Sequence, residues 1–365
     1  MIYFDSGATT LQKPPAVAEA FRYAMAHFAS PGRGGHAPAM AAADAVYACR
    51  EKAAALFDAQ PEQIVFTMNA THALNIAIRT LVRPGDRVVI SGFEHNAVTR
   101  PLHYLGAKTA VAGTRLFDPA DTLEAFSRLL TPETKAAVCT HVSNVFGYIL
   151  PLAQIAALCR ARGIPLIVDA SQSAGILPVS LRGLGAAFIA MPGHKGLYGP
   201  QGTGMLVCGR MPEPLMQGGS GSQSALAEMP DFLPDASEAG THNVSGIHAL
   251  AAGLDFVQSL GLGTILNHEA HLRRLLARGL REIPGALCFT GGAQSGVVSF
   301  LYGAEDCEQT AQRLCEAGIA VRAGLHCAPL AHRSAGTAQS GTVRVSFSVF
   351  NCEEEVAAFL RAVKK

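Results

Sequence analysis

A lysine near the middle of the chain stands between a buried strand and a glycine-rich turn. Lys195 follows the apolar run 188–191 and the pair Gly193-His194, and the glycine-rich segment 199–204 comes shortly after it. Most lysines are solvated surface charges. At the end of a buried strand, however, an amine can lose its proton and condense with an aldehyde to form a Schiff base. The pattern therefore indicates covalent carbonyl chemistry at Lys195.

An aspartate earlier in the chain suits the same chemistry. An electron-accepting pyridine ring works only when its nitrogen stays protonated beside a carboxylate. Asp169 ends the apolar run 165–168, where an unpaired carboxylate is costly and a cationic ring would relieve the cost. Gln172, three residues later, could donate a hydrogen bond to the ring oxygen. Taken alone, Asp169 is as typical of a helix cap.

Two further turns follow predicted strands. The segment 68–73 is a strand-to-helix turn with the hydroxyl of Thr71 at its opening, and backbone donors at a helix start suit a phosphate. His95 lies beyond the strand that ends at Ile90, at the carboxyl edge of the sheet, and could stack on a ring. The alternatives are a plain helix cap at Thr71 and a surface-loop histidine at position 95.

A cysteine near the end of the chain has the surroundings of a nucleophile. Cys327 lies in a loop bounded by glycine and proline, next to His326 and a few residues after Arg322, which favours an exposed, partly thiolate sulfur. Arg344 lies in a strand of alternating pattern, where an inward guanidinium requires an anion such as a substrate carboxylate. A buried structural cysteine and a solvent-facing arginine are the alternatives.

The elements that must position these residues alternate between strands and helices. Four runs have the consecutive hydrophobic residues of parallel strands buried on both faces: 64–66, 87–90, 136–139 and 165–168. Helical patterns between them cover 73–81 and 152–162. This order predicts an α/β layered domain.

The pattern changes after about residue 258. A charged helix at 267–281 precedes short strands at 296–302 and 343–347, and a final helix starts at Glu353. These elements predict a smaller α+β lobe that shares a ligand-binding interface with the first.

Composition limits the function classes. The 365 residues, 49% hydrophobic and 16% charged with a net charge of +1, predict two packed lobes and exclude disorder and nucleic acid as a partner. Residues 1–5 lack a secretory signal and no run is long enough to span a bilayer, so we expect a cytoplasmic protein without a membrane partner. Nine scattered cysteines indicate reduced thiols, eight of them small core residues, and the 13 histidines form no metal-ligand spacing with them.

Together these segments resemble the pyridoxal-phosphate enzymes of the class V aminotransferase fold, in particular the group II cysteine desulfurases and selenocysteine lyases. The resemblance runs from segments 5–9 and 33–36 to the last helix. Its most specific parts are 193–195 with the following Tyr-Gly-Pro, 168–172 and 322–327. It implies transferase fold type I, with a mostly parallel seven-stranded sheet flanked by helices in a large domain (15–258) and a small domain formed by 1–14 and 259–365.

The resemblance also implies roles for individual residues. Lys195 would hold pyridoxal 5'-phosphate and shuttle protons, Asp169 would pair with the pyridinium and His95 would stack on the ring. The implied cofactor-binding residues are Ala70, Thr71, His72, His95, Asp169, Gln172, His194, Lys195 and Thr241. The implied catalytic residues are Lys195, Cys327 and His95, and the implied substrate-binding residues are Asn144, Arg344, His36 and Arg322.

The implied reaction converts cysteine to alanine. The Cys327 thiolate would attack the substrate sulfur, and the resulting persulfide would pass to a thiol or an acceptor protein. With selenocysteine, the family can release selenium without an obligatory covalent step on this cysteine. Thr241 belongs to a segment that reaches the neighbouring subunit's site in this family, which implies a homodimer.

Three places depart from the family pattern, and other functions stay open. Pro192 replaces a frequent phosphate-binding Ser or Thr, and His72 replaces a common acidic residue. Ala236-Ser237 precede Glu238 where an arginine is frequent. The enzyme alternatives are a selenocysteine lyase, another C–S lyase of class V, or an aminotransferase in which Cys327 is incidental. The non-enzyme alternative is a silent sulfur-carrier scaffold, although a scaffold has no physical need for Lys195, Asp169 and His95 together.

Overall fold

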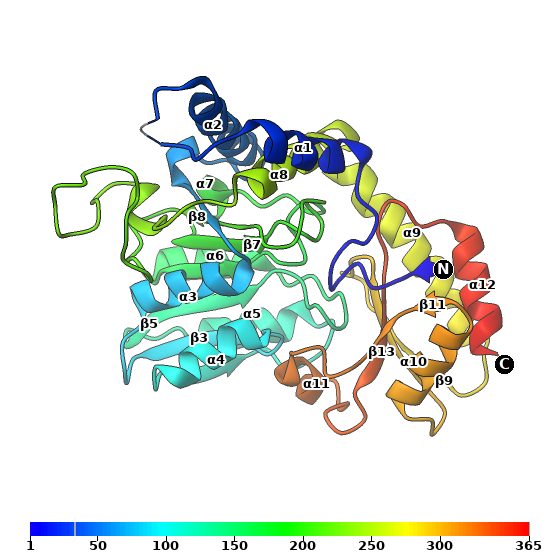
Figure 1. Cartoon of the computed structure of the whole chain (residues 1–365). Coiled ribbons are helices and arrows are strands. Elements are labelled where there is room, and N and C mark those ends of the chain that lie inside the picture. Colours follow the sequence, from blue (N-terminus) through cyan, green and yellow to red (C-terminus); the bar gives the residue numbers. More distant parts are fainter. Residues whose placement is uncertain (33, 365) are drawn as a thin grey trace.

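A seven-stranded sheet carries the larger part of the chain (Figure 1). The computed structural model describes residues 1–32 and 34–364, so Arg33 of the predicted segment 33–36 and Lys365 lie outside the described residues. The strands are β2 (Ile64–Thr67), β3 (Arg87–Ser91), β4 (Lys108–Ala112), β5 (Thr134–Thr140), β6 (Leu166–Asp169), β7 (Phe188–Pro192) and β8 (Gly204–Cys208). Their order in the sheet is β2-β8-β7-β6-β5-β3-β4.

Strands β7, β6, β5, β3 and β4 pair in parallel, whereas β8 pairs antiparallel with both β7 and β2. The mostly parallel seven-stranded sheet is therefore confirmed. The expectation of parallel pairing is wrong for the run 64–66, because β2 is an edge strand whose one partner in the sheet order runs antiparallel. Its consecutive apolar residues reflect burial of both faces rather than the direction of its neighbour.

Helices bury both faces of this sheet. One core contains side chains of α2 (Ala37–Phe57), α5 (Pro119–Leu129), α6 (Leu152–Ala161) and α8 (Val244–Leu260). The opposite core contains side chains of α3 (Ala70–Leu81) and α4 (Asn96–Tyr104). Along β3, Val89 belongs to the first core while Val88 and Ile90 belong to the second, as the alternation of a strand requires. Helix α1 (Pro15–His27) lies along α8 (Figure 1).

Helix α3 begins three residues before the predicted start at residue 73. Asn69 is its N-cap, and the Asn69 side chain accepts a hydrogen bond from the His72 N–H. Asparagine competes well for this position because its short amide reaches the free donors of the first turn. The cap interpretation of Thr71 is therefore wrong, and the Thr71 hydroxyl is not used to start the helix.

A smaller lobe stands beside the carboxyl edge of the sheet (Figure 1). Its antiparallel sheet has the order β12-β13-β10-β9, formed by β12 (Arg322–Gly324), β13 (Thr342–Ser346), β10 (Val297–Tyr302) and β9 (Ala286–Phe289). Its helices are α9 (Leu262–Arg281), α10 (Cys307–Glu316), α11 (Pro329–Ser334) and α12 (Glu353–Val363). The predicted helix at 267–281, the strands at 296–302 and 343–347 and the helix from Glu353 agree with α9, β10, β13 and α12.

The beginning of the chain belongs to this smaller lobe. Strand β1 (Ile2–Tyr3) pairs in parallel with β11 (Ile319–Ala320), and Phe4 packs in a core otherwise formed by residues 272–363. The separate cores support our proposal that residues 15–258 form a large domain and that residues 1–14 join the segment from 259 onward in a small one.

The cysteines are more varied than predicted. All nine are free thiols in the described structure, and Cys49, Cys139, Cys159, Cys208 and Cys307 are buried. The core prediction is wrong for Cys315 and Cys352, which are exposed on α10 and at the N-cap of α12, and Cys288 is half-buried. Cys315 lies on the unburied side of α10, Cys352 precedes α12 as its N-cap, and Cys288 packs against the core of the smaller lobe from its edge.

Two further properties concern the described part of the chain. It holds no single helix that is both long and apolar enough to cross a membrane, and α8 with α9, bent by 80°, meets that test only as a pair. Among residues 1–32 and 34–364, no group of three His, Cys, Asp or Glu side chains is arranged to hold a metal ion.

Candidate active site

A cavity of about 280 Å3 lies where the carboxyl ends of β5, β6 and β7 face the small domain. All but three of the predicted site residues line it: Lys195, Cys327, His95, Ala70, Thr71, Asp169, Gln172, His194, Asn144, Arg344 and Arg322. The size is close to the lower end for small-molecule sites. Residues from segments more than 250 positions apart therefore meet at one place.

Three predicted residues lie elsewhere. His72 lies in the first turn of α3, where its Nδ1 accepts the Met68 N–H at 3.3 Å and burial lowers its pKa. His36 is exposed at the start of α2. Thr241 is exposed beside a separate hollow near Arg50, so within one subunit it does not reach the cavity.

The surroundings of Lys195 favour the neutral form of its amine. Burial lowers its pKa to about 8, although the charge of Asp169 acts in the opposite direction. A lysine with a pKa near 8 has a substantial neutral fraction at physiological pH, which is the form that reacts with carbonyl carbon.

His95 is held as a neutral ring. It caps α4, and its Nδ1 accepts the Ala97 N–H at 3.0 Å, so the neutral ring carries its proton on Nε2. Burial lowers the pKa of His95 to about 4, while Asp169 opposes this shift. A neutral imidazole at a fixed angle suits stacking against an aromatic ring.

The remaining groups of the large domain fit a phosphorylated pyridine aldehyde. Asp169 is 3% exposed, and its Oδ1 accepts the Ser171 N–H at 2.9 Å. The N–H groups of Ala70 and Thr71 open α3 and have no acceptor within the helix. The Nδ1 of His194 is buried without a hydrogen-bond partner among the described residues. Together they supply a carboxylate for a ring nitrogen and unsatisfied donors for a phosphate.

Main-chain anchors hold the loop that carries Cys327. The Asn144 Nδ2 donates to the His326 carbonyl at 2.8 Å, and the Asn96 N–H donates to the Cys327 carbonyl at 2.7 Å. The His326 Nε2 donates to the Thr342 carbonyl at 3.1 Å, and burial lowers the pKa of this ring to about 2. His326 and Cys327 have φ of 48° and 56°, a left-handed conformation that non-glycine residues adopt only when neighbours enforce it. Cys327 is exposed, as the sequence predicted.

A buried arginine closes the other end of the cavity. Arg344 is 1% exposed; its Nη1 donates to the Asn144 carbonyl at 3.0 Å and its Nη2 to Asp5 Oδ1 at 2.5 Å. Arg322 is directly opposite Arg344 in the β12–β13 pair. Two guanidinium groups beside one carboxylate leave net positive charge, which favours the carboxylate of an amino acid.

Gln172 is partly used by the fold. Its Nε2 donates to the Gly7 carbonyl at 2.9 Å, which holds the N-terminal segment against the large domain. Because the amide nitrogen carries two hydrogens, one donor is left for the ring oxygen that the sequence predicted as its partner.

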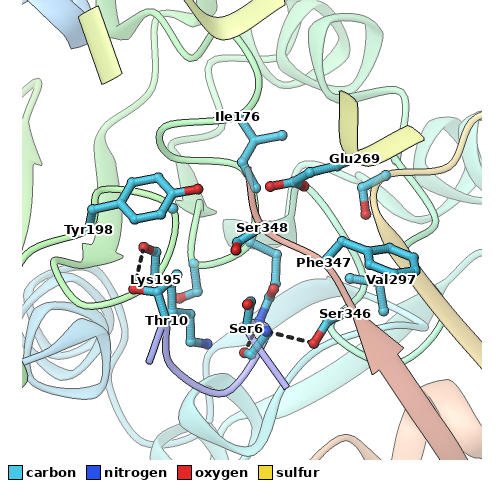
Figure 2. A pocket seen from close by; sticks show the side chains of 15 residues that line it. Ser6, Thr10, Ile176, Lys195, Tyr198, Glu269, Val297, Ser346, Phe347 and Ser348 are labelled. Carbon is cyan, nitrogen blue, oxygen red and sulfur yellow. Dashed lines mark hydrogen bonds between the residues drawn. The ribbon is translucent and has the colours of Figure 1, made fainter. Parts of the chain in front are cut away.

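A smaller enclosed space of about 20 Å3 lies behind Lys195, between the two domains (Figure 2). Its size is enough for one water molecule. Glu269 of α9 reaches this space from the small domain and Tyr198 from the large one (Figure 2). Glu269 is 3% exposed, and burial raises the pKa of its carboxyl to about 8.

Several residues in or beside the cavity were not assigned to the site from the sequence, and Asn69 and Asp5 are the two that hold other parts of it. Asn69 lines the cavity and caps α3, and the preference of asparagine for N-caps was a usable indication. Asp5 is the partner of Arg344 across 339 positions, and no local pattern predicts that contact.

The comparisons with known proteins agree with this geometry. The aminotransferase class-V family model matches residues 2–359, and the chain belongs to that family. This family depends on pyridoxal phosphate.

Named relatives and a solved structure support the same assignment. A probable cysteine desulfurase of Methanothermobacter thermautotrophicus is 34% identical over 378 residues, which cover 97% of this chain and 92% of the relative. One from Mycolicibacterium paratuberculosis is 34% identical over 394 residues, and the chain spans only 55% of that longer protein. The apo structure of a cysteine desulfurase from Thermococcus onnurineus has a TM-score of 0.88 at 32% identity, covering 100% of this chain and 94% of the other.

Proposed function

We propose that this chain is a pyridoxal-phosphate-dependent cysteine desulfurase that converts cysteine to alanine and forms a persulfide on Cys327. One observation carries the proposal: the buried amine of Lys195, from the large domain, and the exposed thiol of Cys327, from the small domain, line the same cavity. A thiol so placed can reach a substrate bound at the lysine.

The cofactor is held by residues of the large domain. Lys195 would attach it covalently, Asp169 would keep the ring nitrogen protonated and His95 would stack on the ring. The N–H groups of Ala70 and Thr71 in the first turn of α3 would receive the phosphate together with His194, and Gln172 would donate to the ring oxygen. When bound, pyridoxal 5'-phosphate supplies an electron-accepting ring that stabilises negative charge at the substrate α carbon.

The protein's own groups carry the sulfur transfer. Arg344 and Arg322 orient the substrate carboxylate, and Asn144 holds the Cys327 loop. The Cys327 thiolate attacks the substrate sulfur, so an S–S bond forms as the Cβ–S bond breaks and the electron pair stays with the substrate carbon. Lys195 Nζ moves protons at the substrate, and alanine leaves while Cys327 keeps the persulfide.

Assembly and acceptor are part of the proposal. Thr241 and His36 lie outside their own cavity, which supports a homodimer in which these residues serve the site of the partner subunit. The persulfide passes to a thiol or an acceptor protein. Nine free thiols suit a reducing compartment, and we place the protein in the cytoplasm.

The test compares two exposed cysteines. Alanine formation from L-cysteine is measured for Cys327→Ala and, as a matched control, for Cys352→Ala, with cofactor absorbance recorded for both. We expect Cys327→Ala to bind the cofactor but to form no alanine. Cys352→Ala should bind the cofactor and form alanine at the rate of the parent protein.

Two outcomes would contradict the proposal. Full activity of Cys327→Ala on cysteine would exclude the persulfide, and turnover of selenocysteine alone would instead indicate a lyase. Borohydride treatment followed by peptide mapping must label Lys195, and a label elsewhere would remove the cofactor attachment.

A further inference from the structure

The outer side of α9 carries a hollow of about 570 Å3 that is lined with arginines. Arg273, Arg274, Arg278 and Arg281 line it, together with Thr290 of the loop after β9. Arg274, Arg278 and Arg281 follow Arg273 by one, five and eight residues. This spacing places the four side chains on one side of the helix. None of the residues that line this hollow lines the cavity of Lys195, so the two are separate.

The arginines lack carboxylate partners. Within residues 1–32 and 34–364, the ion pairs include none of the four. Among the described residues that line the hollow, only His271 forms an ion pair, with Glu353 at 2.7 Å. Four cations therefore converge with little local compensation, an arrangement that concentrates anions at the surface.

Arg273 distinguishes this hollow from a solvated charged face. It is 8% exposed, its Nη1 donates to Gln294 Oε1 at 3.0 Å, and its Nε is buried without a partner in the described structure. Burial lowers the pKa of Arg273, and the charges of Arg274 and Arg281 lower it further. An unpaired buried guanidinium is costly unless an anion compensates it.

We propose that this hollow binds a compact polyanion carrying phosphate or carboxylate groups, with Arg273 as the buried anchor. The planar guanidinium donates in pairs to either group, and the exposed Arg274 and Arg278 add charge at the mouth. The Arg281 Nη2 donates to Thr290 Oγ1 at 2.6 Å, which fixes one wall.

The test uses the enzyme loaded with pyridoxal phosphate, so that the phosphate donors of the active site are occupied. Inorganic pyrophosphate and citrate are titrated separately by calorimetry, which distinguishes phosphate from carboxylate. We expect saturable binding of at least one of them. The double substitution Arg274→Gln/Arg278→Gln should weaken it about tenfold or more, because each charge-assisted hydrogen bond contributes about that factor.

A charge-matched variant is the control. Arg128→Gln/Arg210→Gln removes two exposed arginines outside the hollow and should leave the affinity unchanged within about twofold. Arg273→Lys retains the charge and loses the planar fork, so it should also weaken binding. The proposal is overturned if neither anion saturates the protein, or if the control variant loses as much affinity as the Arg274/Arg278 variant.

Discussion

Removing the side chain of Asn144 tests how the Cys327 loop is held. Asn144→Ala deletes the 2.8 Å hydrogen bond from Nδ2 to the His326 carbonyl but retains the Asn144 carbonyl that Arg344 contacts. Leaving a buried acceptor without its donor costs about 1 to 3 kcal/mol. That free energy lowers the population of the ordered loop relative to open states by roughly 5- to 150-fold.

Hydrogen exchange reports this change without substrate. The Ala328 N–H donates to the Leu325 carbonyl at 2.9 Å inside the loop, so its exchange should accelerate in Asn144→Ala by a factor in that range. The same loosening should lower kcat for alanine formation, since Cys327 is less often in position. Asn96→Ala is the matched control, because position 96 anchors the loop through its backbone N–H.

The reasoning is refuted by a specific combination of results. If the Asn144 side chain acts only on the substrate, Asn144→Ala will raise KM and leave both the Ala328 exchange rate and kcat unchanged. If Asn96→Ala loosens the loop as much as Asn144→Ala, the assignment of these two anchors is wrong.

Two further predictions concern buried titratable groups. The folded protein keeps a proton on Glu269 that the unfolded chain releases, because the pKa is about 8 in the fold and 4.5 ordinarily. The stability that this proton contributes is therefore complete below pH 4.5 and is lost as pH rises through 8. In urea unfolding, the free energy of unfolding of Glu269→Gln should increase relative to that of the parent protein as pH rises from 5 to 8.5. Uptake of pyridoxal phosphate by apoprotein, followed by absorbance, should rise with pH through about 8 as Lys195 becomes neutral. Asp169→Asn should shift that midpoint to lower pH, because the Asp169 charge raises the lysine pKa.

The sequence predicted the site residues whose positions depend on the pattern of neighbouring residues. Lys195 and Asp169 each follow a consecutive apolar run, and such runs become central strands whose carboxyl ends share one edge. The meeting of these two side chains in one cavity therefore follows from the pattern of the sequence. The sequence did not predict that β2 pairs antiparallel, because an edge strand covered by helices on both faces has the same composition as a parallel strand.

Contacts between distant segments could not be predicted. The hydrogen bond from Asn144 to the His326 carbonyl spans 182 positions, and nothing in either segment encodes the other. The exposure of Cys315 and Cys352 was mispredicted from a residue-type preference that a single amphipathic helix can override. The roles of the individual site residues remain predictions for the variants described above.

The N-terminal segment also constrains when the protein can become active during synthesis. Asp5 contacts Arg344 and the Gly7 N–H donates to Ser346 Oγ, so a wall of the cavity joins positions 339 residues apart. On the ribosome, Lys195 emerges long before Arg344, and the large domain can fold while its cavity is still open on one side. A nascent chain stopped before β13 lacks Ser346 and Arg344, which line the two spaces beside Lys195, so the pocket is complete only after β13 has been synthesised.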